Sequence, residues 1–185
     1  MRGFILGIIV TIVVIAAVGL FVLETGRVNM RADVPPSSLE TSVAGHAMDA
    51  SVARNAPSIA NPVQPTEQNL VDGAEIYSFK CAQCHGDPAH PKSLLAETLN
   101  PPPPQFFGDD RPDMPENHNY YITLHGIRLT GMPGWKNALT DEQIWKVVTF
   151  LSHLDNLPPK AKSVFGLTGA APAATPAAAP AKPKK

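Results

Sequence analysis

The chain has 185 residues, with 15 lysines and arginines against 16 aspartates and glutamates, and a formal net charge of −1. Nothing in this charge balance suggests nucleic acid, and we expect no partner of that class. Hydrophobic residues make up 44% of the chain but are concentrated at its start, and there are 20 prolines. We therefore expect an anchor, a small domain and segments that cannot form a core.

Residues 3–23 carry no charged side chain. As a helix they would be about 32 Å long, enough to cross the hydrocarbon core of a bilayer. A cleavable signal peptide has a shorter apolar region, followed by a cleavage site of small residues. Residues 24–27, Glu-Thr-Gly-Arg, offer no such site. We predict an uncleaved signal anchor over residues 1–24, with a removed signal peptide as the alternative.

Prolines punctuate residues 25–68, which we interpret as a linker. Within it, residues 38–54 have the pattern of a helix that Ser37 or Ser38 can cap. Its apolar residues fall near one face; these are Leu39, Val43, Ala47, Met48 and Val52. We expect this helix to dock on the following domain or to lie at the membrane surface, and a loosely structured tether is the alternative.

Residues 69–158 have the patterns of a small helical domain. We predict a first helix over residues 70–81 and a weaker one over about 115–126. A last helix begins at Thr140, whose spacing from Gln143 is that of a capping box. An apolar stripe follows; it consists of Ile144, Val147, Val148, Leu151 and Leu154. We expect the prolines at 158–159 to end that helix, and the absence of alternating strand patterns predicts an all-α domain.

Both cysteines of the chain lie in the sequence Cys81-Ala-Gln-Cys84-His85. This spacing is the attachment signature of a c-type haem, in which two thiols add to the vinyl groups and the histidine binds the iron. A thioredoxin-like pair would follow a strand, and a zinc site would need four ligands. The preceding segment has a helical pattern, and no second cysteine pair exists. A structural disulfide is the remaining alternative.

Residues 159–185 consist largely of alanine, proline and lysine. Such a segment cannot bury enough apolar surface to fold, so we predict a disordered tail. The domain before it is short for an independent core, and small domains often need a staple. A single covalently held haem would serve as that staple.

The domain resembles the class I cytochromes c, small electron carriers with one haem. The resemblance rests on Gly73 and Tyr77 before the cysteine motif, on the prolines at 101–104, on the sequence Thr-Gly-Met-Pro-Gly-Trp at 130–135, and on Phe150. It implies that the first and last helices cross closely at Gly73, with Tyr77 and Phe150 packed beside the crossing.

Met132 is the predicted second axial ligand of the iron, opposite His85. Its thioether is soft and neutral, which favours reduced iron and raises the reduction potential. Gly131 and Gly134 on either side allow the loop to approach closely. Met114 is the second choice, and a histidine or an open position is the remaining alternative.

The resemblance implies two further site residues. A backbone carbonyl in the proline run, which we assign to Pro102, would accept the Nδ1–H of His85 and strengthen that ligand. Trp135 would pack beside the haem edge or the propionates, although a plain core aromatic is an equal alternative.

As a whole, the chain is therefore expected to be a membrane-anchored electron carrier that cycles between ferric and ferrous iron. The resemblance places its haem domain on the periplasmic side of a bacterial cytoplasmic membrane, with redox proteins in or near that membrane as partners and no small-molecule substrate. A fixed haem subunit of a larger respiratory or dehydrogenase complex is the first alternative. A haem enzyme with an open distal site is the second.

Overall fold

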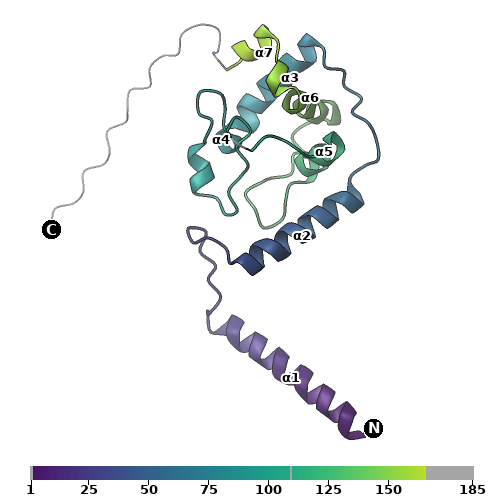
Figure 1. Ribbon diagram of the computed structural model, residues 1–185, viewed down its shortest axis with the longest axis vertical. Helices are drawn as coiled ribbons and strands as arrows, with labels where there is room; N and C mark the ends of the chain where they lie inside the picture. The colour runs from purple at the N-terminus through teal and green to yellow at the C-terminus, as the bar shows by residue number, and fades with distance from the viewer. Residues whose placement is uncertain (1, 109, 166–185) are drawn as a thin grey trace, which may run out of the picture. The chain divides into compact units, whose positions relative to one another are not determined.

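The computed structural model describes residues 2–108 and 110–165. The chain forms two compact units, Met1–Val34 and Pro35–Lys185. All regular elements in the described ranges are helices, and no strand occurs among them. This confirms the predicted all-α fold (Figure 1).

The first unit contains α1 (Arg2–Glu24), which is long and apolar enough to cross a membrane. No side chain of α1 is buried within the protein. A signal sequence near the N-terminus would have the same length and composition. The choice between an anchor and a cleaved signal peptide therefore stays a prediction.

The second unit is built on the crossing of α3 (Glu67–Lys80) and α6 (Asp141–Ser152). Gly73 lies at the point of contact, where a Cβ atom would come 2.8 Å from the Cβ of Phe150 and would run into the carbonyl oxygen of Lys146. Only glycine allows two helices to approach this closely. The Lys146 ammonium also bridges the two helices, at 2.8 Å from Asp72. The crossing implied by the resemblance is thus present.

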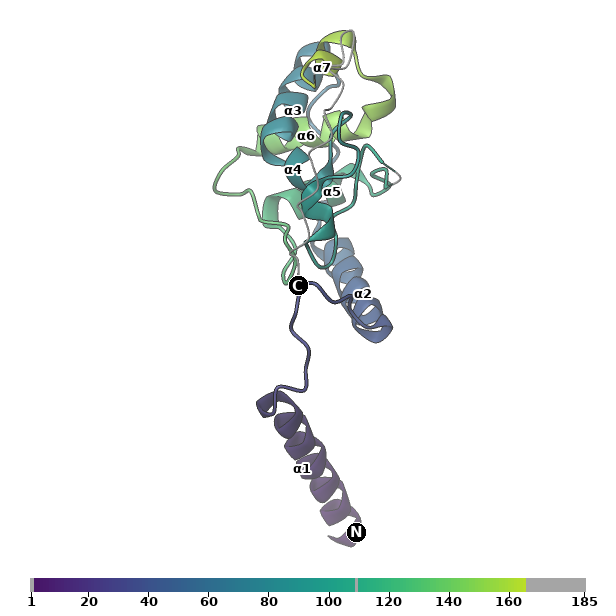
Figure 2. The ribbon, with the colours of Figure 1, turned by 90° about the vertical axis from the view of Figure 1, so that its left-hand side faces the viewer.

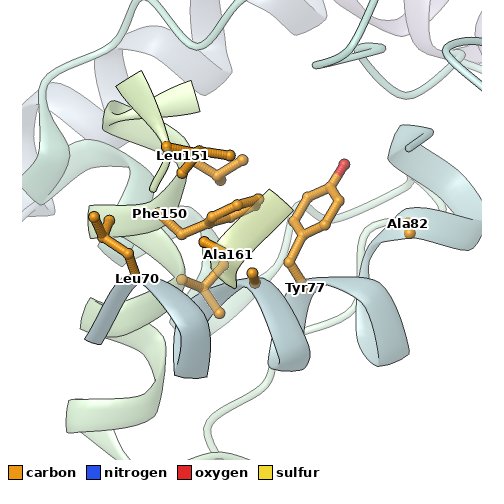
Figure 3. Close-up of a cluster of buried hydrophobic side chains, with 9 residues drawn as sticks. Leu70, Tyr77, Ala82, Phe150, Leu151 and Ala161 are labelled. Atoms are coloured by element: carbon orange, nitrogen blue, oxygen red, sulfur yellow. The ribbon is translucent and has the colours of Figure 1, made fainter. Parts of the chain in front are cut away.

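A cluster of buried side chains fills the space beside this crossing (Figure 3). Tyr77 of α3 and Phe150 of α6 are fully buried, and their ring centroids are 5.4 Å apart. Leu70 and Leu151 extend the cluster along the same two helices. The predicted caps of α6 are also present, since Thr140 and Gln143 form a reciprocal capping box. These contacts fix the end of α3, from which the cysteine motif follows.

The end of the domain differs from the expectation. α6 ends at Ser152, before the prolines, and a short 3₁₀ turn, η2 (Leu154–Asn156), leads to α7 (Pro159–Ser163). α7 packs against α3 (Figure 2), and Ala161 is fully buried there.

The prediction of a disordered tail from residue 159 is therefore wrong for residues 159–165. Phe165 packs on the cluster around Tyr77, and the Lys160 ammonium lies 2.6 Å from the Glu67 carboxylate. Ala161, Val164 and Phe165 all pack on this cluster, and composition alone does not distinguish such a short helix from the tail. Residues 166–185 lie outside the described residues.

The predicted linker of residues 25–68 is likewise too long, because residues 35–66 belong to the second compact unit. α2 (Ser38–Asn55), in the place where a helix is expected, packs against α5 (Glu116–His125) and buries Val52. The segment after α2 is held by side-chain amides. Asn117 donates to the carbonyl of Pro57 at 2.9 Å, and Asn61 donates to Thr149 Oγ1 at 2.8 Å.

The expected apolar face of α2 is wrong in part. Leu39 and Val43 are 71% and 60% exposed, whereas Val52 is buried against the domain. Leu39 and Val43 are four residues apart and share one side of the helix, while Val52 lies about 180° around the axis from Val43. The apolar residues of α2 are spread over both sides of the helix, so the sequence pattern does not identify which side is buried.

Candidate haem-binding site

The cysteine motif occupies the end of α3 and the single turn of α4 (Ala82–His85). Cys81 and Cys84 are half-buried free thiols, which argues against the disulfide. Burial raises the pKa of the Cys81 thiol to about 12, so this sulfur lacks the thiolate character of a thioredoxin-like redox centre. Within the described ranges, no three His, Cys, Asp or Glu side chains gather into a group that could hold a metal ion.

His85 is buried, with 8% of its surface exposed. Burial lowers the pKa of its imidazole, so the ring is neutral at physiological pH, the form that binds metal ions. Its Nδ1 lies 2.9 Å from the carbonyl oxygen of Pro104. Since a carbonyl only accepts, Nδ1 carries the proton and Nε2 is the nitrogen left for iron.

The expected acceptor in the proline run is therefore confirmed, but it is the carbonyl of Pro104, and the choice of Pro102 within the run is wrong. Pro102 is exposed and lines a shallow surface groove with Lys92 and Glu97. The four prolines are alike in sequence, so nothing in the run distinguishes the carbonyl that faces the imidazole. The ring of Phe106 stacks on the imidazole, with centroids 4.7 Å apart and planes within 4°.

The loop that carries Met132 is fastened to the C-terminal end of α5. The amides of Trp135 and Lys136 donate to the carbonyls of Thr123 and Leu124 at 3.0 and 3.1 Å. Thr130 fixes Met132 itself, because its Oγ1 accepts from the Met132 amide at 3.0 Å. The backbone of the predicted ligand is thus held from two directions.

Gly126, which follows α5, makes the close contact between the Met132 loop and the end of α5 sterically possible. It has a φ of +71°, and a Cβ atom there would lie 2.5 Å from the amide nitrogen of Gly134 and 2.7 Å from the Met132 carbonyl oxygen. The sequence pattern points to Gly131 and Gly134 but not to Gly126. A glycine directly after a predicted helix is the signal that could have identified it.

Trp135 packs against a second buried cluster, which contains Tyr120, Ile144 and Trp145. The rings of Tyr120 and Trp145 are stacked, with centroids 4.2 Å apart. This is the core position expected as the alternative for Trp135. A contact between Trp135 and the haem edge stays a prediction.

The donor set fits a haem c. Two free thiols lie one turn apart, a neutral buried imidazole has its Nδ1 engaged, and a thioether sits in a braced loop. The hydroxyl of Tyr77 ties this motif to the core, since it donates to the carbonyl of Gly86 at 2.8 Å. When bound, the haem supplies one-electron redox chemistry, and the protein supplies the ligands and their orientation.

Comparison with a known protein family agrees with this fit. A family model described as "Cytochrome C oxidase, cbb3-type, subunit III" matches residues 68–151. Over 100 residues the chain is 29% identical to one of the subunits of nicotinate dehydrogenase from Pseudomonas putida, and the aligned part is 51% of this chain but 8% of that protein. A solved reducing HAO-like protein complex of Kuenenia stuttgartiensis aligns with a TM-score of 0.43 and 23% identity, over 53% of this chain and 50% of that one.

Proposed function

Because residues 68–151 form a c-type cytochrome domain, an electron-transfer module that holds haem c, we propose that the protein is a membrane-anchored electron carrier. One haem is attached through thioethers to Cys81 and Cys84, and His85 and Met132 are its axial ligands. The haem domain lies on the periplasmic side of a bacterial cytoplasmic membrane. Its partners are redox proteins in or near that membrane.

The observation that carries this proposal is the bracing of both predicted ligands. His85 is fixed through its Nδ1 by the Pro104 carbonyl, and the backbone of Met132 is fixed by Thr130. Ligands that hardly move between oxidation states keep the reorganisation of the site small, which favours fast electron transfer over substrate binding. A filled distal position also argues against a haem enzyme.

Covalent attachment is tested by replacing both Cys81 and Cys84 with alanine. The wild-type chain should keep its haem after denaturation and extraction, whereas the double variant should lose it. Haem retained by the double variant would contradict the attachment. Ligation is tested by exposing the reduced wild-type protein to carbon monoxide, which should bind slowly or not at all. Rapid binding would indicate an open distal position and support the enzyme alternative.

A fixed subunit of a larger redox complex is the second candidate, and the length of the tether favours it. α1 ends at Glu24 and the second unit begins at Pro35, so only about ten residues connect them. A fully extended chain of that length spans at most about 35 Å, and a flexible one averages about 17 Å. A haem domain on so short a tether reaches only neighbours in the same membrane.

The relative in P. putida is itself named as a subunit of a dehydrogenase, which agrees with this second candidate. Purification from native membranes in mild detergent distinguishes the two. A stable complex of fixed stoichiometry would support the complex, and a monodisperse single chain would support the carrier. Mass spectrometry of the co-purified chains would identify the redox partner.

A further inference from the structure

Three consecutive residues hold the cysteine motif from the side of His85. The carbonyl of Pro104 accepts from the His85 Nδ1 at 2.9 Å. The side-chain Nε2 of Gln105 donates to the carbonyl of Cys84 at 2.9 Å. The amide of Phe106 donates to the carbonyl of His85 at 3.1 Å. Of these three residues, only Gln105 uses its own side chain to form the hydrogen bond.

The proline run before Gln105 has no hydrogen-bond donors of its own that could orient its backbone carbonyls. Residues 101–104 are all prolines and have no N–H group, so their carbonyls must be oriented by donors from outside the run. Gln105 supplies one of them, because its Nε2 also donates to the Pro103 carbonyl at 2.7 Å. Its backbone amide, the first after the run, donates to Asp110 Oδ2 at 3.0 Å.

The carboxamide of Gln105 is buried, with the residue 9% exposed, and both ends of it are used. Its Oε1 accepts from the amide of Ser93 at 2.7 Å. The Ser93 hydroxyl in turn donates to the Cys84 carbonyl at 2.8 Å. One side chain therefore joins three segments around the predicted ligand: the motif, the loop that precedes η1 (Leu94–Glu97), and the proline run.

We propose that Gln105 is a positioning residue for His85, which sets the direction of the Pro104 carbonyl toward Nδ1 and thereby tunes the reduction potential of the haem. A carbonyl well aligned with Nδ1–H makes the imidazole a stronger donor. A stronger donor favours ferric iron and lowers the potential. This inference rests on the proposed function, in which His85 is an axial ligand of the haem iron.

The test replaces Gln105 with methionine, which is neutral and similar in size but cannot make the three hydrogen bonds. Changes to hydrogen-bond partners of metal ligands typically alter metal binding 10–100-fold. We expect the equilibrium ratio of ferrous to ferric protein at a given potential to rise about tenfold, which corresponds to an increase in reduction potential of about 59 mV for a one-electron couple. Redox titration of the purified haem protein measures this change. Proton NMR of the ferric form should show altered shifts of the haem methyl groups, which report the ring plane of His85.

Gln105→Asn is the second variant, because it keeps the carboxamide on a side chain shorter by one methylene. It should raise the potential by less than Gln105→Met, and it gives the same measurement if the methionine variant does not accumulate with haem. Asn61→Leu is the matched control. It removes a partly buried side-chain amide that bonds Thr149 Oγ1 at 2.8 Å and the Val63 amide at 2.9 Å, partners that are not part of the His85 site.

A raised potential in both Gln105 variants with an unchanged potential in Asn61→Leu would support the inference. Gln105 variants that unfold more easily but keep the wild-type potential would overturn it, since Gln105 would then be merely structural. An equal rise in Asn61→Leu would also overturn it. Wild-type protein without covalent haem would contradict the proposed function instead, so the two failures are distinguishable.

Discussion

Replacing Gly73 with alanine should destabilise the domain, because the added methyl group has no space between α3 and α6. Its Cβ would lie 2.8 Å from the Phe150 Cβ and overlap the backbone carbonyl of Lys146. A backbone atom cannot move aside as the end of a flexible side chain can, so the helices must separate. Such overpacking costs about 1–3 kcal/mol, and here the upper end applies because the contact is with backbone.

The helix propensity of alanine opposes this by about 1 kcal/mol. A net loss of about 2 kcal/mol should lower the Tm by roughly 6–12 °C for a domain of this size. Thermal unfolding of the haem-loaded protein, followed by far-UV circular dichroism, measures it. Gly45→Ala in α2 is the control, since nothing lies within 4 Å of the Cβ it would add, and it should raise the Tm slightly. A Gly73→Ala variant as stable as the wild type would refute the close crossing.

Three further predictions concern the second unit. Val52→Ala should cost about 1–3 kcal/mol of unfolding free energy, because Val52 is buried against the domain. Val43→Ala, on the exposed side of α2, should cost almost none. Equal losses of unfolding free energy in denaturant titrations of the two variants would mean that α2 does not dock as described. Tyr77→Phe should cost about 1–2 kcal/mol of unfolding free energy, because it leaves the buried carbonyl of Gly86 without its hydrogen bond. An unchanged denaturation midpoint would be inconsistent with the hydrogen bond from Tyr77 to Gly86. The hydrogen bond from Lys146 holds the pKa of Asp72 below its usual value, so the ionised carboxylate contributes fully to stability above the unfolded-state pKa of about 3.9, and this contribution is lost as pH falls through the lower folded-state pKa. Asp72→Asn should therefore lower the free energy of unfolding more at pH 7 than at pH 3. An equal loss of unfolding free energy at both pH values would rule out the contribution of this ion pair.

The two helices that cross were predictable because their signals are local in the sequence, whereas the crossing itself was implied by the resemblance to the class I cytochromes c. Gly73 and Tyr77 are four residues apart on one helix, and the capping box of α6 marks where the partner helix begins. The cysteine motif is contiguous as well. These features place α3, the cysteine motif and α6 along the chain without any knowledge of tertiary contacts.

The missed features depend on contacts between distant segments. Residues 35–66 have the proline pattern of a linker, yet amide hydrogen bonds such as that of Asn61 fasten them to the domain. α7 was not predicted because its residues have the alanine, proline and lysine composition of the tail that follows, and the burial of Ala161 depends on the packing of α7 against α3. Gln105 carries no motif, and its importance comes from three partners that only the fold assembles around it.

The ligation of the haem by Met132 is the central claim, and the visible spectrum of the ferric Met132→Ala protein tests it most directly. The wild-type spectrum should contain the methionine–iron charge-transfer band. The variant should lack this band and have a lower reduction potential, because a neutral thioether that favours ferrous iron has been removed. A band of unchanged position and intensity in Met132→Ala would contradict the assignment, and Met114→Ala would then be the variant expected to lose it.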